Sequence, residues 1–201
     1  MAEDFAAGPD PSLPAPGAPD DDAAARRRKN RASIRLAILF GAYIGALFAI
    51  RWIPFTDEAI FQPFTRFVAL TSHGVIRLLG EETTLDDVDV VGEGVAISIR
   101  EECNAIPAIF IFFAAVLAFP APWKKKALGL ALGFPAIFAV NTVRVVTLYY
   151  AAKYCSRDIF EALHLYVWQA LVIIFAIFTW IFWADHVVAK PKRPPLAAPV
   201  R

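Results

Sequence analysis

The sequence predicts an all-α polytopic membrane protein with four transmembrane helices, an interfacial or re-entrant amphipathic helix and a small external β-hairpin. Hydrophobic residues make up 58% of the 201 residues, with 17 Phe and 5 Trp among them. They cluster in long runs, which is typical of membrane-spanning helices. Lys and Arg gather in short clusters beside these runs, and no basic stripe with interleaved aromatic residues indicates nucleic-acid binding.

The two ends of the chain differ from its apolar middle. Residues 1–32 are predicted to be a disordered cytoplasmic tail, because the first 25 or so are rich in Pro, Ala, Gly and Asp. The tail closes with a juxtamembrane basic cluster that contains Arg26, Arg27, Arg28, Lys29 and Arg31. Since this cluster follows the tail, the segment does not resemble a cleavable signal peptide. Residues 190–201 are predicted to form a second cytoplasmic basic tail.

Residues 33–189 are predicted to be the membrane-embedded domain. Its four apolar runs are Ile34 to Ile53, Ala105 to Phe119 extending toward Trp123, Ala127 to about Tyr150, and about His164 to Val188. Each is near the length that crosses a bilayer. Cytoplasmic loops collect Lys and Arg, so the basic N-terminus, Lys124–Lys126 and the basic C-terminus are all placed inside. Residues 54–103 then lie outside.

Two segments between the first and second runs are not expected to span. Residues 57–79 are apolar but contain Arg66, His73 and Arg77, and a crossing here would place Lys124–Lys126 outside. We therefore expect an interfacial or re-entrant amphipathic helix, with a spanning helix as the alternative. Between Leu85 and Arg100, apolar and polar residues alternate on both sides of Gly92-Glu93-Gly94, which predicts a β-hairpin.

Three polar side chains from three different predicted helices converge on the outer end of this bundle. Cys103 precedes the second span, with Asn104 as its expected N-cap and Pro107 in the first turn. Arg144 lies near the outer end of the third span, with Asn141 on the same helical face. His164 opens the fourth span. A thiol, a guanidinium and an imidazole together favour acyl transfer through a thioester.

Each of these residues also has a simpler interpretation. A buried Cys packs as a small apolar side chain, an Arg near a helix end snorkels to headgroups, and a His often lies at the interface. Cys103 and Cys155 are both placed outside, so a structural disulfide is a further alternative. The sequence shows no metal-ligand spacing and no nucleotide-binding motif, so no metal and no cofactor are predicted.

Three stretches resemble the exosortase/archaeosortase family of membrane transpeptidases. They are Glu-Glu-Cys-Asn-Ala-Ile around Cys103, Asn-Thr-Val-Arg-Val from Asn141, and His164 at the last span. The resemblance covers roughly residues 34–188 and is greatest to the exosortase H branch. It implies Cys103 as nucleophile, Arg144 as transition-state stabiliser and His164 as acid/base. Ala105 is a departure, because many members carry Gly at this position.

The resemblance also implies a substrate and a location. The substrate would be a secreted protein with a C-terminal sorting signal composed of a short motif, a hydrophobic helix and a basic cluster. Cleavage would occur at the outer face of the bacterial cytoplasmic membrane, among membrane lipids. The alternative is a non-catalytic membrane scaffold for envelope or exopolysaccharide assembly. Transport is disfavoured, because the polar groups lie at one end and no intramembrane carboxylates pair.

Overall fold

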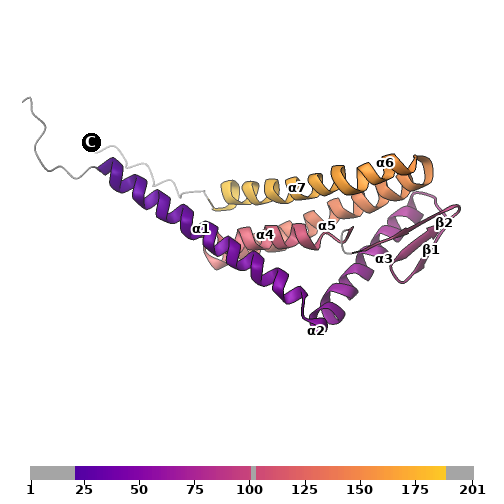
Figure 1. Ribbon diagram of the computed structural model, residues 1–201, viewed down its shortest axis with the longest axis horizontal. Coiled ribbons are helices and arrows are strands. Elements are labelled where there is room, and N and C mark those ends of the chain that lie inside the picture. Colours follow the sequence, from indigo (N-terminus) through magenta and orange to yellow (C-terminus); the bar gives the residue numbers. More distant parts are fainter. Residues whose placement is uncertain (1–20, 101–102, 189–201) are drawn as a thin grey trace, which may run out of the picture.

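The computed structural model describes residues 21–100 and 103–188 and is mostly helical (Figure 1). The N-terminal half contains α1 (Asp21–Arg51), α2 (Pro54–Thr56), the π-helix η1 (Asp57–Phe61), α3 (Gln62–Leu78) and three strands, β1 (Thr83–Asp86), β2 (Asp89–Gly92) and β3 (Val95–Ser98). The C-terminal half contains α4 (Ile106–Ala118), α5 (Trp123–Tyr154), α6 (Arg157–Ala162), η3 (Leu163–Val167), α7 (Trp168–Trp183) and η4 (Ala184–Val188).

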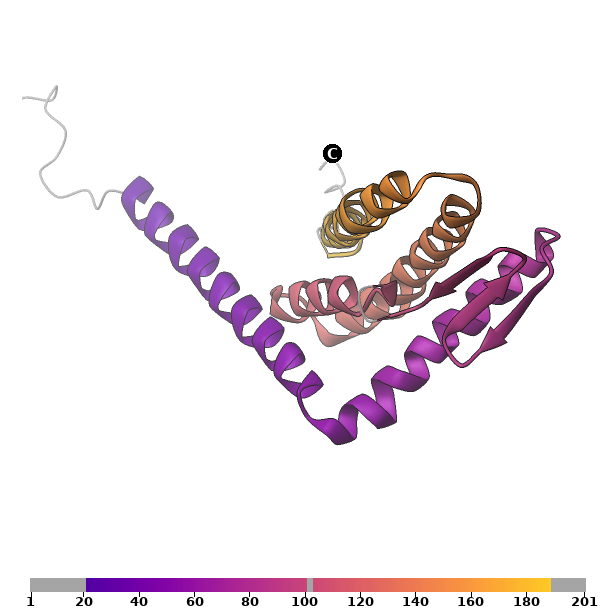
Figure 2. The ribbon, with the colours of Figure 1, turned by 45° about the vertical axis from the view of Figure 1, so that its right-hand side comes forward.

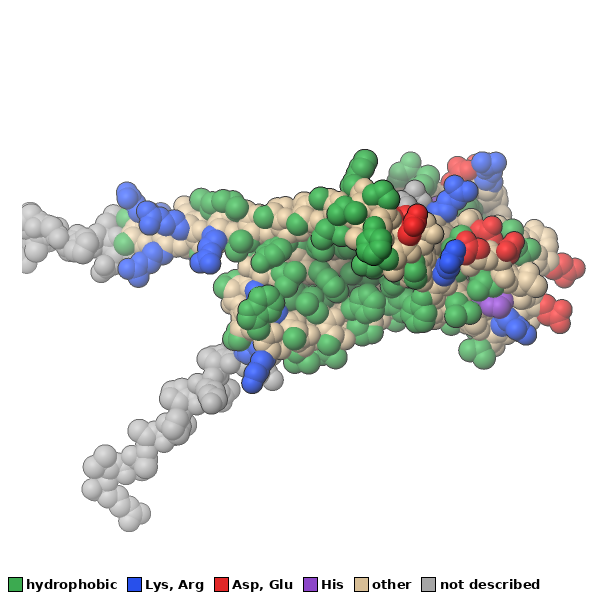
Figure 3. All heavy atoms as spheres, turned by 90° about the horizontal axis from the view of Figure 1, so that it is seen from below, with side chains coloured by type: hydrophobic (Ala, Val, Ile, Leu, Met, Phe, Trp, Pro, Cys, Tyr) green, Lys and Arg blue, Asp and Glu red, His purple; other side chains and the backbone are tan. Residues whose placement is uncertain are grey.

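Three helices of the described part are long and apolar enough to cross a membrane. They cover Ala23–Arg51, Trp123–Tyr154 and Arg157–Val188. The space-filling view has a hydrophobic middle section, with Lys and Arg at one end and mixed charges at the other (Figure 3). The remaining predicted span, α4, has only 13 residues. At 1.5 Å per residue it is about 20 Å long, against about 30 Å for a hydrocarbon core. Four spans therefore remain a prediction.

Helix boundaries differ from the predicted ones in a consistent direction. The first helix begins at Asp21, so residues 21–32 are helical in place of the predicted disordered tail. The last begins at Arg157, so His164 lies inside a helix and does not open it. Both helices begin earlier than predicted because their first turns are polar, and hydropathy marks only the apolar part of a helix. Residues 1–20, 101–102 and 189–201, including most of both predicted tails, lie outside the described residues.

The amphipathic segment forms η1 and α3 and leaves α1 at a sharp angle (Figure 2). The buried residues of α3 recur at helical spacing and are Thr65, Val68, Ala69, Ser72 and Ile76. They face α5 and the first two strands. The predicted amphipathic helix is present, and it is not among the helices long enough to span.

The predicted hairpin is one part of a three-stranded antiparallel sheet with the order β1-β2-β3. The additional strand is β1, and the residues between β1 and β2 include Asp87, at φ 52°. A left-handed conformation is one that Asp tolerates better than most residues. Gly94, at φ 71°, turns the chain between β2 and β3. The last strand runs back toward the start of α4 (Figure 2).

Candidate active site

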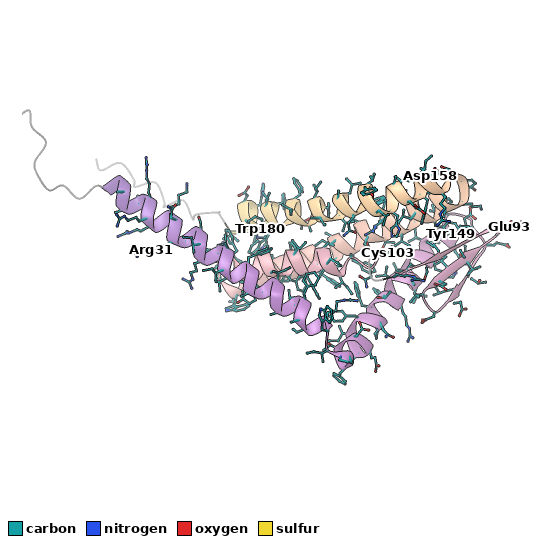
Figure 4. All side chains as sticks on the ribbon, viewed as in Figure 1. Arg31, Glu93, Cys103, Tyr149, Asp158 and Trp180 are labelled. Atoms are coloured by element: carbon teal, nitrogen blue, oxygen red, sulfur yellow. The ribbon has the colours of Figure 1, made fainter. Side chains whose placement is uncertain are left out.

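Cys103 and His164 are in direct contact. Cys103 Sγ lies 3.0 Å from His164 Nε2, which is hydrogen-bonding distance for a thiol and an imidazole. Cys103 is buried, and His164 is half-buried. Figure 4 places Cys103 in the interior, where the bundle meets the sheet. The sequence placed these residues at the same end of the bundle, and the structure brings them into contact.

The turn that carries Cys103 is held by buried hydrogen bonds. Asn141 Nδ2 donates to the Cys103 carbonyl at 2.8 Å. Asn104 Oδ1 accepts from the Ile106 N–H at 3.1 Å, so its side chain satisfies an N–H of the first turn of α4. The N-cap residue is nevertheless Ala105, one residue later than predicted. Asn141 is fully buried and Asn104 is 1% exposed, so both of these contacts are shielded from water.

Ala105 adopts a left-handed conformation at φ 60° and ψ 4°. This region is costly for a residue with a Cβ and is the usual place of Gly. A glycine, which the resemblance led us to expect at this position, would adopt this conformation without strain. Pro107 follows in the first turn of α4, where its missing N–H costs nothing.

Thr65 joins the amphipathic helix to this turn. Its hydroxyl accepts from Asn104 Nδ2 at 2.9 Å and donates to the Phe61 carbonyl at 2.9 Å. Thr65 was not identified from the sequence. Its helical spacing marks it as a buried position of α3, but its partner lies 39 residues away.

Arg144 is 2% exposed and lies one helical turn after Asn141 on α5. It lines a cavity of about 360 Å³ together with His164, Arg51 and Gln169. The guanidinium and the imidazole therefore face a common space near the ends of α1, α4 and α7. Arg51 is a second residue that sequence reasoning missed. The sequence feature that could have identified it is a basic residue at the outer end of the first span, opposite the N-terminal basic cluster.

His164 belongs to the π-helical turn η3 between α6 and α7. Such a turn contains one residue more than an α-turn and frequently occurs at functional sites. It shifts the helical register, so that residues on α6 and α7 do not form one continuous stripe. The ring of Phe160, on α6, lies 5.7 Å from the His164 ring, centroid to centroid.

Cys103 and Cys155 are not joined to each other, so the structure does not contain the disulfide considered above. Cys155 is exposed, at the C-terminal end of α5. Of the two cysteines, only Cys103 contacts an imidazole.

These features define a class of protein: a membrane protein with a thiol–imidazole pair and a buried arginine where its helices meet a small sheet. Comparison with family models gives the family. Residues 32–184, about three quarters of the chain, match the family described as Transmembrane exosortase (Exosortase_EpsH). The chain belongs to the transmembrane exosortase family. Comparison with curated proteins and with solved structures gave no match.

Proposed function

We propose that this protein is a membrane cysteine transpeptidase or protease that cleaves the C-terminal sorting signal of secreted proteins through a thioester intermediate. The observation that carries the proposal is the contact of 3.0 Å between Cys103 Sγ and His164 Nε2 in a chain of the exosortase family. A cysteine held against a histidine is the arrangement by which a weak nucleophile becomes an active one.

The proposed reaction has two halves. His164 takes the proton of the Cys103 thiol, and the sulfur attacks the scissile carbonyl carbon to form a tetrahedral oxyanion. The oxyanion collapses, His164 protonates the leaving amine, and the substrate's new C-terminus remains as a thioester on Cys103. Water or an amine then attacks the thioester, His164 accepts its proton, and the Cys103 thiol is restored.

Arg144 is assigned to the oxyanion. It shares a cavity with His164, and a buried guanidinium stabilises a developing negative charge strongly. Asn141 holds the Cys103 carbonyl and thereby the backbone of the nucleophile. The supporting roles of Asn141 and Asn104 are positional, since their side chains hydrogen-bond to backbone groups of the turn at Cys103.

The proposed substrate fits the membrane part of the molecule. An apolar groove of about 380 Å³ lies between α1, α4 and α7, and its lining includes Phe40, Ile111, Ala115, Ala176 and Trp180. It would hold the hydrophobic helix of the sorting signal by close packing, as helices associate in lipid. The basic cluster of the signal would then lie on the side of Lys124–Lys126. We place the termini in the cytoplasm and the site on the outer side of the bacterial cytoplasmic membrane.

The proposal is tested by trapping the thioester in membranes. The substrate is a tagged secreted reporter whose C-terminal signal comes from a protein of the organism that encodes this chain. Wild type should cleave it and form an adduct that hydroxylamine releases. Cys103→Ala should form none, and Cys103→Ser should form no hydroxylamine-labile thioester.

Cys155→Ala is the matched control, since it removes the exposed free thiol and should retain full activity. Cleavage that persists in Cys103→Ala would refute the assignment. Absence of cleavage in wild type would favour the scaffold interpretation.

A further inference from the structure

The last strand of the sheet has an unpaired edge that leads to the Cys103–His164 pair. β3 pairs with β2 on one side, and no fourth strand pairs with it within residues 21–100 and 103–188. Ile99 N donates to Val88 O at 3.0 Å, so Ile99 points its backbone groups toward the β2 side. Backbone direction alternates along an antiparallel strand. The N–H and C=O groups of Ala96 and Ser98 therefore point away from β2.

A groove of about 340 Å³ runs along this edge. Five consecutive residues, 96–100, line it. The face of a strand presents only alternate residues, so a consecutive run means that the groove follows the edge. The α5 residues Val145, Leu148 and Ala152 also line the groove, as do Phe160 and His164.

Cys103 also lines this groove. Its N–H donates to the Arg100 carbonyl at 2.9 Å, so the nucleophile lies just beyond the end of the strand. The outward side chains of β3, Ala96 and Ser98, are small and uncharged. Proteins usually block an exposed edge with charge or proline, and this edge has neither over β3.

We propose that this groove binds the substrate segment N-terminal to the scissile bond as a fourth strand, added parallel to β3. The inference rests on the function proposed above and adds to it the conformation and direction of the bound peptide. Backbone hydrogen bonds to Ala96 and Ser98 would supply affinity, as in other cases of strand addition.

The direction follows from the order of the substrate's parts. In the proposed substrate the hydrophobic helix lies C-terminal to the cleaved bond. The peptide must therefore run from the sheet toward the membrane. β3 runs in the same direction, because it leads through Cys103 into α4.

The groove also predicts a pattern of side chains. Successive residues of an extended peptide point to opposite faces. Every second residue would face Val145 and Leu148, which are buried and apolar, and would be small or apolar itself. The intervening residues would face water and be unrestricted.

The test is disulfide scanning in membranes with the reporter defined above. The enzyme carries Cys103→Ala and Cys155→Ala, with a single new cysteine from Ser98→Cys or Ala96→Cys. The reporter carries one cysteine at each successive position before its hydrophobic helix. We expect crosslinks at alternate reporter positions. Changing from Ser98→Cys to Ala96→Cys should shift the pattern by two positions toward the reporter's N-terminus.

Thr84→Cys, on the exposed face of β1, is the control and should give no crosslink. A shift toward the C-terminus, a pattern without alternation, or no crosslink at β3 would overturn the proposal. Cysteine-dependent cleavage of the same reporter by wild type separates these failures from failure of the proposed function. If wild type does not cleave the reporter, both proposals fall.

A kinetic comparison gives an independent readout. Ser98→Pro removes one edge N–H without removing a β2–β3 hydrogen bond, and proline is tolerated on edge strands. We expect KM to rise about five- to tenfold, which corresponds to the free energy lost with one hydrogen bond. Ser98→Ala keeps the N–H and should raise KM less than Ser98→Pro does. Equal KM values for both variants would contradict strand addition.

Discussion

The two ends of the helical bundle use polar side chains in different ways. At the end that contains Lys124–Lys126, Lys125 Nζ donates to the Val188 carbonyl at 3.0 Å, and Lys126 Nζ donates to the Leu117 carbonyl at 2.5 Å. The opposite end contains Cys103. There, Arg144 and His164 line a cavity of about 360 Å³. At the first end the lysine side chains bond to helix-end carbonyls. At the second end a guanidinium and an imidazole line an open cavity.

This difference has a physical basis. The last carbonyls of a helix lack intrahelical partners and carry partial negative charge, so a lysine ammonium stabilises them. Trp183 adds a third contact by donating from Nε1 to the Lys125 carbonyl at 2.9 Å. At the Cys103 end, the polar groups that hold the backbone are uncharged amides and a hydroxyl. Substitutions at the two ends should therefore affect stability and turnover separately.

The largest effect is expected from Arg144→Lys. The variant retains the positive charge and loses the planar fork of donors. Turnover of the reporter should fall roughly 100- to 1,000-fold, the range seen when an oxyanion donor is lost, with little change in KM. Arg157→Lys is the control, because Arg157 forms an exposed ion pair with Glu161. Turnover within a few fold of wild type would remove Arg144 from the mechanism.

Gly129→Ala should affect the other end. A Cβ at Gly129 would lie 2.5 Å from Trp183 Nε1, so the indole must shift and release the Lys125 carbonyl. We expect a loss of about 1–3 kcal/mol in stability, as for other overpacked sites, with turnover per folded molecule unchanged. Thermal unfolding in detergent measures the change in stability, and reporter cleavage measures turnover per folded molecule. Gly45→Ala, with no neighbour within 4 Å, should not destabilise.

Thr65→Val tests the hydrogen bond that holds Asn104. The substitution keeps the shape and leaves the buried Asn104 amide without its acceptor, so the turn at Cys103 loosens. The kcat should fall about tenfold, equivalent to about 1.4 kcal/mol, and KM should stay the same. Thr65→Ser should restore kcat. Thr71→Val is matched to it, because Thr71 makes the same bond to its own helix on an exposed face. Equal losses in both valine variants would indicate a general effect on α3.

The smallest effect is expected from Ala105→Gly. Relief of the left-handed strain favours glycine by about 1–2 kcal/mol. The greater freedom of glycine in the unfolded chain and the loss of a buried methyl group oppose this by about 1–2 kcal/mol together. Stability should therefore change by less than about 1 kcal/mol, whereas Ala105→Val should be clearly destabilising. Equal melting temperatures for the glycine and valine variants would contradict the observed backbone conformation.

The sequence was informative where a local pattern determines the structure. Apolar runs located α1, α5 and α7, and the charged residues within the apolar segment 57–79 indicated an amphipathic helix. The topology also brought Cys103 and His164 to one end of the bundle. Their contact distance could not be inferred, because it depends on the π-helical turn at Leu163–Val167. No local sequence signal marks such a turn.

The features that were missed depend on distant contacts or weak patterns. β1 has the sequence Thr-Thr-Leu-Asp, with one strongly apolar residue, so alternation was not visible there. Thr65 acquires its role only from Asn104, and Arg51 only from the cavity it shares with Arg144. The length of α4 was overestimated because Phe119 and Trp123 continue the apolar composition beyond the helix end at Ala118.

The shortness of α4 has a consequence for the surrounding lipid. A 13-residue helix is about 10 Å shorter than the hydrocarbon core. If α4 crosses the membrane, lipids beside it must compress, because a short helix is accommodated by thinning of the bilayer. The thiol would then lie below the level of the surrounding headgroups. Acyl-chain length would then set how far the bilayer must thin beside Cys103, so reporter cleavage is expected to depend on membrane thickness.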